Sequence, residues 1–372
     1  MNKSARKLRD VYAVKAGAPL FHKEFGYYCM DAWHAQGLPE NADLAAIFHY
    51  DSRGDFCLTG LGGCTAELFP CFEEKVIEDK GDTEIVQDSA GRHVLYFKGR
   101  RNGFMPEYVD HPVKDMKSWE EKIKWRMNSQ TPGRLEDMRN RIELARPAAE
   151  NELMIRQYMV GGYMYLRSLI GPESLLYAFY DMPELIHECM KSWLELADKV
   201  TAFYQKYLSF DELLLDEDIC YNNGALISPE MILEFLIPYY QQLITNVRSR
   251  QIDKNRQLYI HLASDGFVDP LIPLYTEKIG LNVMSPFEVA SGSDVVRIGQ
   301  DFPDLVISGG IDKRILAAGK DAIDKELERI LPPMIARGGY IPTCDHGVPE
   351  EVSLENYMHY RERCMEYSPL LV

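Results

Sequence analysis

Short apolar runs alternate with longer amphipathic stretches along this chain, most regularly after residue 150. Each run has the length and composition of a buried strand. In the stretches between them, apolar residues recur at three- and four-residue steps, most clearly over Pro183–Tyr207. The apolar runs are Leu153–Met159, Glu212–Ile219, Gln257–Ala263, Leu281–Pro286, Leu305–Gly309 and Tyr340–Thr343. Because strands that alternate with helices pair in parallel, the pattern predicts regular βα repeats over residues 150–372.

The part before residue 150 is less regular. Leu44–Tyr50 (LAAIFHY) predicts a buried strand, Phe21–Gln36 predicts a helix, and the glycine-rich Gly54–Cys64 predicts a loop. Residues 72–112 differ in character, because loosely alternating and β-rich segments flank a turn. This pattern predicts a β-hairpin or small antiparallel sheet, inserted as a decoration.

The predicted fold class is α/β, a (β/α)8 TIM barrel that forms a single domain over residues 1–372. The six repeats after residue 150, Leu44–Tyr50 and one further strand in the first half make up eight strands. A doubly wound parallel sheet is the alternative, but no GxGxxG fingerprint or phosphate-binding loop supports it.

Charge and composition narrow the class of partner. The chain has 41 Lys and Arg against 57 Asp and Glu, a net charge of −16, which disfavours nucleic acids and anionic membranes. The 8 cysteines are scattered without a CxxC pair, and the basic N-terminus has no apolar signal region. No apolar run approaches the ~18 residues of a membrane helix. We therefore expect a cytoplasmic protein.

Polar residues follow each predicted strand, where the active site of a (β/α)8 barrel lies. The stretch Gly338–Pro349 (GGYIPTCDHGVP) is the densest case, because three reactive side chains stand side by side. The candidate residues at the strand ends are Arg156, Tyr163, Asp218, His261, Asp265, Glu288, Asp312, Cys344, Asp345 and His346.

Three of these candidates predict a metal site. His261, Cys344 and either Glu288 or His346 would supply nitrogen, sulfur and oxygen ligands to Zn²⁺, leaving one position open for substrate. No short metal motif has this spacing, so only the barrel would bring the ligands together. The alternative is that His261 donates to a carbonyl group and Cys344 is a buried core residue.

Several segments of the C-terminal half together resemble the uroporphyrinogen decarboxylase superfamily. They are EDICYNNGALISPEMILEFLIPYY (217–240), PFE (286–288), SGGIDKRILA (308–317), GGYIP (338–342) and the following CDHGVP. This superfamily includes true decarboxylases and cobalamin-dependent methyltransferases of the methanol, methylamine and O-demethylase kind. The resemblance covers roughly residues 150–372 and implies a (β/α)8 barrel with the active site at its mouth.

The resemblance is nearer to the methyltransferase branch. True decarboxylases carry an MRQAGRY-type segment whose arginines bind substrate carboxylates, whereas residues 21–39 here have no such motif. The zinc methyltransferases use a His-x-Cys pair and a last cysteine. His261 matches the histidine, but Ala263 occupies the cysteine position and either Cys344 or Asp345 falls near the last one. Glu288, Asp265 or His346 would have to replace the missing ligand.

The resemblance therefore implies a corrinoid-dependent methyltransferase. It would move a methyl group between a small methylated compound, such as a methoxy-arene or methylamine, and a separate corrinoid protein. Asp218, Asp265, Asp345 and His346 would be catalytic, Arg156, Tyr163 and Asp312 would bind the cofactor, and His261, Glu288 and Cys344 would bind zinc. We expect the cobalamin to arrive on a partner protein, because no segment resembles a built-in cobalamin module.

Two alternatives remain open. A decarboxylase of tetrapyrrole metabolism would use Asp218, Asp265 or Asp345 to stabilise cationic pyrrole character without a metal. A catalytically silent barrel would bind a ligand and do no chemistry, as the missing cysteine at Ala263 suggests. The oligomeric state is also open, with a homodimer among the options.

Overall fold

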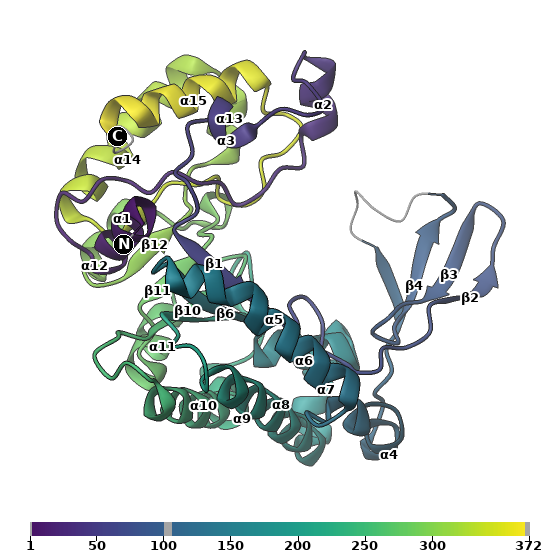
Figure 1. The fold of residues 1–372 in the computed structure, drawn as a ribbon. Coiled ribbons are helices and arrows are strands. Elements are labelled where there is room, and N and C mark those ends of the chain that lie inside the picture. Colours follow the sequence, from purple (N-terminus) through teal and green to yellow (C-terminus); the bar gives the residue numbers. More distant parts are fainter. Residues whose placement is uncertain (1, 100–105, 369–372) are drawn as a thin grey trace.

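A sheet of seven parallel strands forms the centre of the molecule (Figure 1). The computed structural model describes residues 2–99 and 106–368. The strands pair in the order β1-β6-β7-β10-β11-β12-β13. Their bounds are β1 Asp55–Leu58, β6 Met154–Val160, β7 Glu212–Asp216, β10 Tyr259–Ala263, β11 Val283–Ser285, β12 Val306–Ser308 and β13 Tyr340–Ile341. The six strands predicted after residue 150 are therefore confirmed, with parallel pairing between neighbours.

Helices connect the strands and pack on their outer side. The longer ones are α5 Pro132–Glu150, α6 Gly162–Ile170, α7 Pro172–Asp181, α8 Pro183–Tyr204, α10 Ile237–Arg250, α11 Leu271–Ile279, α14 Lys320–Arg337 and α15 Leu354–Tyr367. The shorter ones are α9 Pro229–Phe235, α12 Val295–Asp301 and α13 Lys313–Ala318. Their starts follow local chemistry: Pro183 opens α8, and the Ser228 side chain accepts from the Met231 N–H at the start of α9. The predicted apolar stripe of α8 is buried.

The prediction of eight strands is confirmed only in part, because the described residues form a seven-stranded sheet that does not close on itself. The strand predicted at Leu44–Tyr50 is wrong. Residues Leu44–Ile47 form the short helix α3, since the Asp43 carboxylate accepts from the N–H groups of Ala45 and Ala46. The first strand, β1, lies instead within Gly54–Cys64, where the sequence predicted only a loop.

The N-terminal segment Leu20–Tyr28 lies across the open side of the sheet, between β13 and β1. On one side, Glu24 accepts from the Cys344 N–H (2.9 Å) and the Tyr28 N–H donates to the Val348 carbonyl (2.9 Å). On the other side, the His22 carbonyl accepts from the Asp51 N–H at 2.9 Å, shortly before β1. This irregular segment thus occupies the place of an eighth strand.

Only the end of the helix predicted at Phe21–Gln36 forms, as α2 Met30–Ala35. The preceding residues are extended because they cross the sheet opening. Cys29 and Trp33 are buried, whereas Phe25 and Tyr28 are 51% and 62% exposed. The prediction of one helix over Phe21–Gln36 is therefore wrong except at its end.

Helix α1, Lys3–Tyr12, closes the amino-terminal end of the barrel. Its side chains Leu8, Val11 and Tyr12 pack against inward-facing residues of four strands. Those residues are Met154, Val283, Val306 and Ile341, and Phe21 of the N-terminal segment joins them. Because α1 fills this end with apolar side chains, the polar strand ends at the other side remain as the open mouth.

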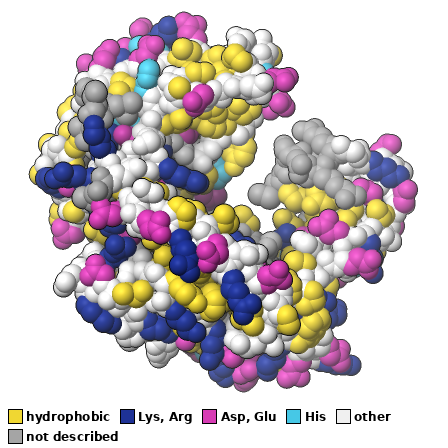
Figure 2. Space-filling model, viewed as in Figure 1, with side chains coloured by type: hydrophobic (Ala, Val, Ile, Leu, Met, Phe, Trp, Pro, Cys, Tyr) yellow, Lys and Arg dark blue, Asp and Glu magenta, His cyan; other side chains and the backbone are white. Residues whose placement is uncertain are grey.

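A four-stranded antiparallel sheet forms an arm beside the barrel, which confirms the predicted insertion (Figure 1). Its strands are β2 Lys75–Asp79, β3 Thr83–Gln87, β4 His93–Phe97 and β5 Glu107–Asp110. The space-filling view shows a hollow between this arm and the rest of the molecule (Figure 2). Helical turns over Met116–Met127 follow the arm. Among the described residues, no helix is both long and apolar enough to cross a membrane.

The tyrosine network behind the N-terminal segment gives a test of this closure. The buried Tyr357 hydroxyl donates to Glu24 Oε2 and is hydrogen-bonded to Tyr50. Tyr357→Phe leaves Glu24 Oε2 without its donor, whereas the Tyr50 hydroxyl keeps its bond to Tyr27. We expect the variant to lower the free energy of unfolding by about 1–3 kcal/mol. Urea denaturation measures this change. Tyr207→Phe, which alters an exposed ring, is the matched control, and an equal loss in both variants would contradict the prediction.

Candidate active site

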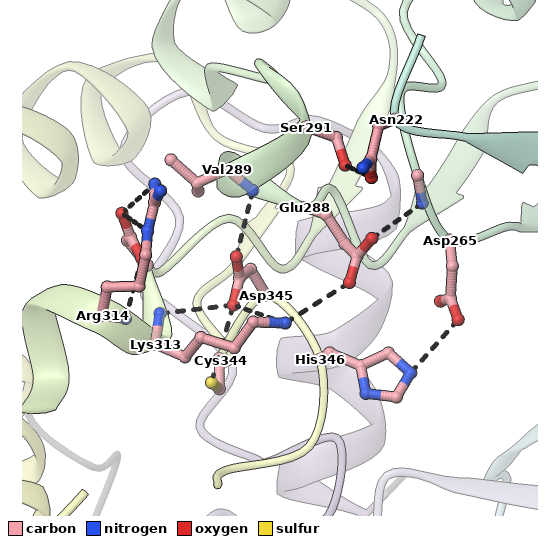
Figure 3. Close-up of polar contacts among 12 residues, drawn as sticks. Asn222, Asp265, Glu288, Val289, Ser291, Lys313, Arg314, Cys344, Asp345 and His346 are labelled. Atoms are coloured by element: carbon pink, nitrogen blue, oxygen red, sulfur yellow. Dashed lines mark hydrogen bonds and ion pairs between the residues drawn. The ribbon is translucent and has the colours of Figure 1, made fainter. Parts of the chain in front are cut away.

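The carboxyl ends of the parallel strands bring together a group of charged side chains, which we call the mouth. The mouth comprises Asp216, Asp218, Asp265, Glu288, Lys313, Asp345 and His346, together with Arg167 of α6. Figure 3 shows that residues after β10, β11, β12 and β13 point toward one another. The parallel sheet accounts for this, because all its strands end at one edge.

Lys313 links two carboxylates at the centre of the mouth (Figure 3). Its Nζ lies 3.3 Å from Glu288 Oε1 and 3.8 Å from Asp345 Oδ1. Asp345 is buried and also accepts from the N–H groups of Val289 (3.0 Å) and Lys313 (3.3 Å). Burial raises the pKa of Asp345, and the Lys313 ammonium partly offsets this effect. Although burial opposes the charge of Lys313, the two carboxylates raise its pKa.

His346 and Asp265 form the second pair of the mouth (Figure 3). His346 Nε2 lies 3.3 Å from Asp265 Oδ2, although 81 positions separate the residues (346 − 265 = 81). The hydrogen bond to Asp265 raises the pKa of His346, while burial works against this. The exposed rings of Phe25 and Tyr28 flank the imidazole, with centroid distances of 5.1 and 5.9 Å. The pair with Asp265 therefore favours the protonated form of His346.

Asp216 and Asp218 extend the mouth at the end of β7. The Tyr158 hydroxyl donates to Asp216, and Arg167 forms an ion pair with Asp218. Burial raises the pKa of both carboxyl groups. Asp218 has a positive φ of 41°, a conformation that aspartate tolerates better than most residues. In the mouth as defined, both cations already contact carboxylates, so no cation there is free to bind an acidic substrate.

The three predicted zinc ligands do not come together. His261 lies inside the barrel, where Nδ1 is 2.6 Å from Glu212 Oε1 and Nε2 is 2.8 Å from Ser285 Oγ. Cys344 is buried with its Sγ 3.9 Å from Asp345 Oδ1, and burial raises the pKa of its thiol. Within residues 2–99 and 106–368, no three His, Cys, Asp or Glu side chains could hold a metal ion. The arrangement therefore does not fit zinc, because the predicted ligands do not converge and both ring nitrogens of His261 already have partners.

The three residues predicted to bind a cofactor come from three different elements, namely β6, the start of α6 and the start of α13. Arg156 forms ion pairs with Asp55 and Glu212 inside the barrel. Tyr163 is buried at the start of α6, on the helix side of the sheet. The Asp312 carboxylate caps α13 and pairs with Arg314. The role of these residues in cofactor binding stays a prediction.

The sequence pattern did not single out Tyr158, Arg167 and Lys313. Tyr158 could have been found, because it lies two positions after Arg156 on β6 and so faces the same side. Lys313 follows directly on Asp312 at the end of β12. No local signal connects Arg167 to Asp218, since the contact depends on how α6 packs beside β7.

Comparisons with known proteins place the chain in a family. The family model described as uroporphyrinogen decarboxylase (URO-D) matches residues 96–367. A uroporphyrinogen decarboxylase of Geobacter metallireducens is 26% identical over 181 residues, which are 48% of this chain and 50% of the relative. One of Geobacter sulfurreducens is 27% identical over 170 residues, 45% and 47% of the two chains. This chain thus spans about half the length of these curated relatives.

A solved structure covers nearly the whole chain. A methyltransferase from Methanosarcina mazei matches with a TM-score of 0.57 and 17% identity, over 97% of this chain and 98% of that chain. At this identity the likeness establishes a shared fold and nothing finer.

Removing the central cation of the mouth tests its electrostatics. In Lys313→Met, Asp345 keeps its two backbone N–H donors but loses its ammonium partner. Because the pKa of Asp345 is already raised in the folded protein, the uncompensated charge costs stability only where Asp345 is ionised. We expect a loss of about 1–3 kcal/mol near pH 8 and a smaller loss near pH 5.

Chemical denaturation at the two pH values measures both losses. Lys254→Met, at an exposed lysine outside the mouth, is the control. A loss for Lys313→Met that is equal at both pH values would show that the Asp345 charge does not depend on Lys313.

Proposed function

The chain belongs to the uroporphyrinogen decarboxylase family, and we propose that it transfers a methyl group between a small methylated compound and a separate corrinoid protein. The observation that carries this proposal is the His346–Asp265 pair at the mouth. A proton donor at this position suits the departure of an alkoxide, phenolate or amine from a methyl carbon.

The proposed step needs one proton and no redox partner beyond the methyl acceptor. The acceptor supplies an electron pair to the methyl carbon, and the bond from that carbon to the leaving oxygen or nitrogen breaks. A leaving oxygen keeps the bond electrons and takes the proton from His346 Nδ1, because Nε2 faces Asp265, which stabilises the imidazolium beforehand. The corrinoid, carried by a partner protein, would supply the nucleophilic cobalt. No step uses zinc, because the predicted ligands do not converge.

The charge of the mouth favours a neutral or cationic substrate. Five carboxyl groups face two cations there, and each cation is already paired. A tetrapyrrole that carries several carboxylates would meet repulsion from Asp216, Asp218 and Glu288 unless it displaced these pairs. Methoxy-arenes and methylammonium compounds have no such conflict.

Decarboxylation of a tetrapyrrole is the second candidate. The observation that favours it is the name of the curated relatives, which align with about half of this chain. In that reaction Asp218, Asp265 or Asp345 would stabilise the cationic pyrrole.

The pH dependence of methyl transfer tests the role of His346. Only the imidazolium can donate a proton, so the rate should fall as the pH rises through the raised pKa of His346. Asp265→Asn removes the group that raises this pKa and should move the fall to lower pH. His346→Gln should lower the rate about 10²–10⁴-fold for an oxygen leaving group.

Single-turnover transfer to free cob(I)alamin, from a panel of methoxy-arenes and methylamines, measures these rates. His93→Gln is the matched control, because His93 pairs with Asp110 on the arm at 3.9 Å. An unchanged pH profile in Asp265→Asn would overturn the role of the pair. Release of CO2 from uroporphyrinogen without any methyl transfer would establish the second candidate, and ligand binding without either reaction would indicate a silent barrel.

A further inference from the structure

Glu217 lies between Asp216 and Asp218 in sequence, but its carboxyl group is in the layer between the sheet and the helices. The side chain is fully buried, with an exposed fraction of 0%. Oε1 accepts from the Tyr240 hydroxyl at 2.6 Å and lies 3.4 Å from the Tyr275 hydroxyl. Within the described part of the chain no donor meets the geometry of a full hydrogen bond to Oε2, although the backbone N–H of Tyr163 is close enough to favour the charged form. A buried carboxylate with one oxygen that lacks a full hydrogen bond is costly, whereas the neutral acid costs much less.

The cap residue of α6, Gly161, and its first residue, Gly162, leave space that a side chain would take from Glu217 and from its partner Tyr240. A Cβ at Gly161 would lie 1.8 Å from Glu217 Oε2, and a Cβ at Gly162 would lie 2.8 Å from the Tyr240 hydroxyl. The Gly162 N–H donates to the Tyr240 hydroxyl at 2.6 Å, and Gly161 offers no side chain to cap the helix. Glu217 and Tyr240 together replace the missing cap of α6.

This contact joins the two elements that build one side of the mouth. Strand β7 ends in Asp216 and leads to Asp218, and α6 carries Arg167, the partner of Asp218. Glu217 fixes the end of the strand relative to the start of the helix. Any shift of Glu217 therefore moves the carboxylate and the guanidinium of the Arg167–Asp218 pair relative to each other.

We propose that Glu217 holds a proton in the folded protein and is the positioning residue of the mouth, so that loss of this proton loosens the Arg167–Asp218 pair. The role in the reaction rests on the proposed methyl transfer, but the proton itself and the geometry do not. Glu217 would contact no substrate and would act only through α6 and β7.

The surroundings of Glu217 favour the neutral acid near neutral pH. Burial raises its pKa to about 7, while the hydroxyl of Tyr240 and the backbone N–H of Tyr163 act in the opposite direction. The groups that face it are Tyr240 from α10, Tyr275 from α11, Tyr163 from α6 and the like-charged Asp216 beside it. None of these is a cation that could hold the charged form.

Infrared spectroscopy and the variant Glu217→Gln test the proton without any turnover. In the wild type we expect the C=O band of a protonated buried carboxylic acid near pH 6 and its loss near pH 8, following the raised pKa. The band should be absent in Glu217→Gln and unchanged in the control Glu195→Gln, at an exposed glutamate of α8. A wild type without this band near pH 6 would overturn the proposal.

The thiol of Cys64 reports on the geometry, because it lies near Asp216, Asp218 and Arg167. We expect the rate at which iodoacetamide alkylates Cys64, relative to the rate at the exposed Cys71, to change between pH 6 and pH 8 in the wild type. In Glu217→Gln this relative rate should change less, because only the ordinary ionisation of the thiol contributes there. Peptide mass spectrometry resolves the two sites. Tyr240→Phe, which keeps the acid but breaks the bridge to Gly162, should perturb the Cys64 rate at both pH values.

The kinetic readout separates positioning from a merely structural role. Near pH 6, Glu217→Gln should have the wild-type rate of methyl transfer. Near pH 8 it should lose less activity than the wild type does, and this difference should appear in kcat, with little change in KM. Identical pH profiles and identical Cys64 rates in wild type and Glu217→Gln would overturn the proposal. If the infrared and thiol results hold while no methyl transfer occurs, the proposed function fails and the positioning role stands.

Discussion

Glu24 holds the N-terminal segment across the side of the sheet that no strand closes. Its two carboxylate oxygens accept from the Phe25 and Cys344 N–H groups and from the Tyr357 hydroxyl. Cys344 directly precedes Asp345 and His346, so the same carboxylate that closes the barrel also fixes the start of the stretch that carries these two mouth residues. Burial raises the pKa of Glu24, which shows that this position costs free energy and that the three donors must offset it. The mouth depends on this closure, because Phe25 and Tyr28 beside His346 belong to the same segment.

In and around the mouth, burial raises the pKa of carboxyl groups and ion pairing lowers it. Which of the two effects is larger differs between residues. For Glu212, inside the barrel, Arg156 and His261 outweigh burial and lower the pKa. For Asp345 the single ammonium of Lys313 does not outweigh burial, so its pKa is raised. Glu217 has no cation at all and shows the effect of burial most plainly. The balance between burial and contact with cations therefore sets the direction in which the pKa of each carboxyl group moves.

The sequence predicts the part of this architecture that repeats and misses the part that is unique. The six βα units after residue 150 follow from periodicity, and with them the meeting of Asp265 and His346 at one edge. Strand β1 was not predicted, because four residues within a glycine-rich segment are too few to show a recognisable alternation of apolar and polar positions. Leu44–Ile47 misleads because a short apolar run fits a helix as well as a strand, and the Asp43 cap decides. The sequence could have predicted that the Glu217 side chain points away from the mouth, because side chains alternate between the two faces of a strand and its neighbours Asp216 and Asp218 face the mouth. Its partner Tyr240 was not, because it comes from a helix whose packing the sequence does not specify.

The pKa shifts of the mouth residues bear on the type of reaction more directly than membership of the family does. The raised pKa of His346 favours the protonated imidazole. The raised pKa values of Asp216, Asp218 and Asp345 favour the protonated, neutral form of these carboxyl groups. Shifted pKa values of this kind cluster at sites that transfer protons. Such a site can donate a proton to a leaving atom without binding a compensating anion. A ligand that adds several carboxylates would raise these pKa values further and would add negative charge beside the carboxyl groups already present, so the electrostatics of this mouth disfavour acidic ligands.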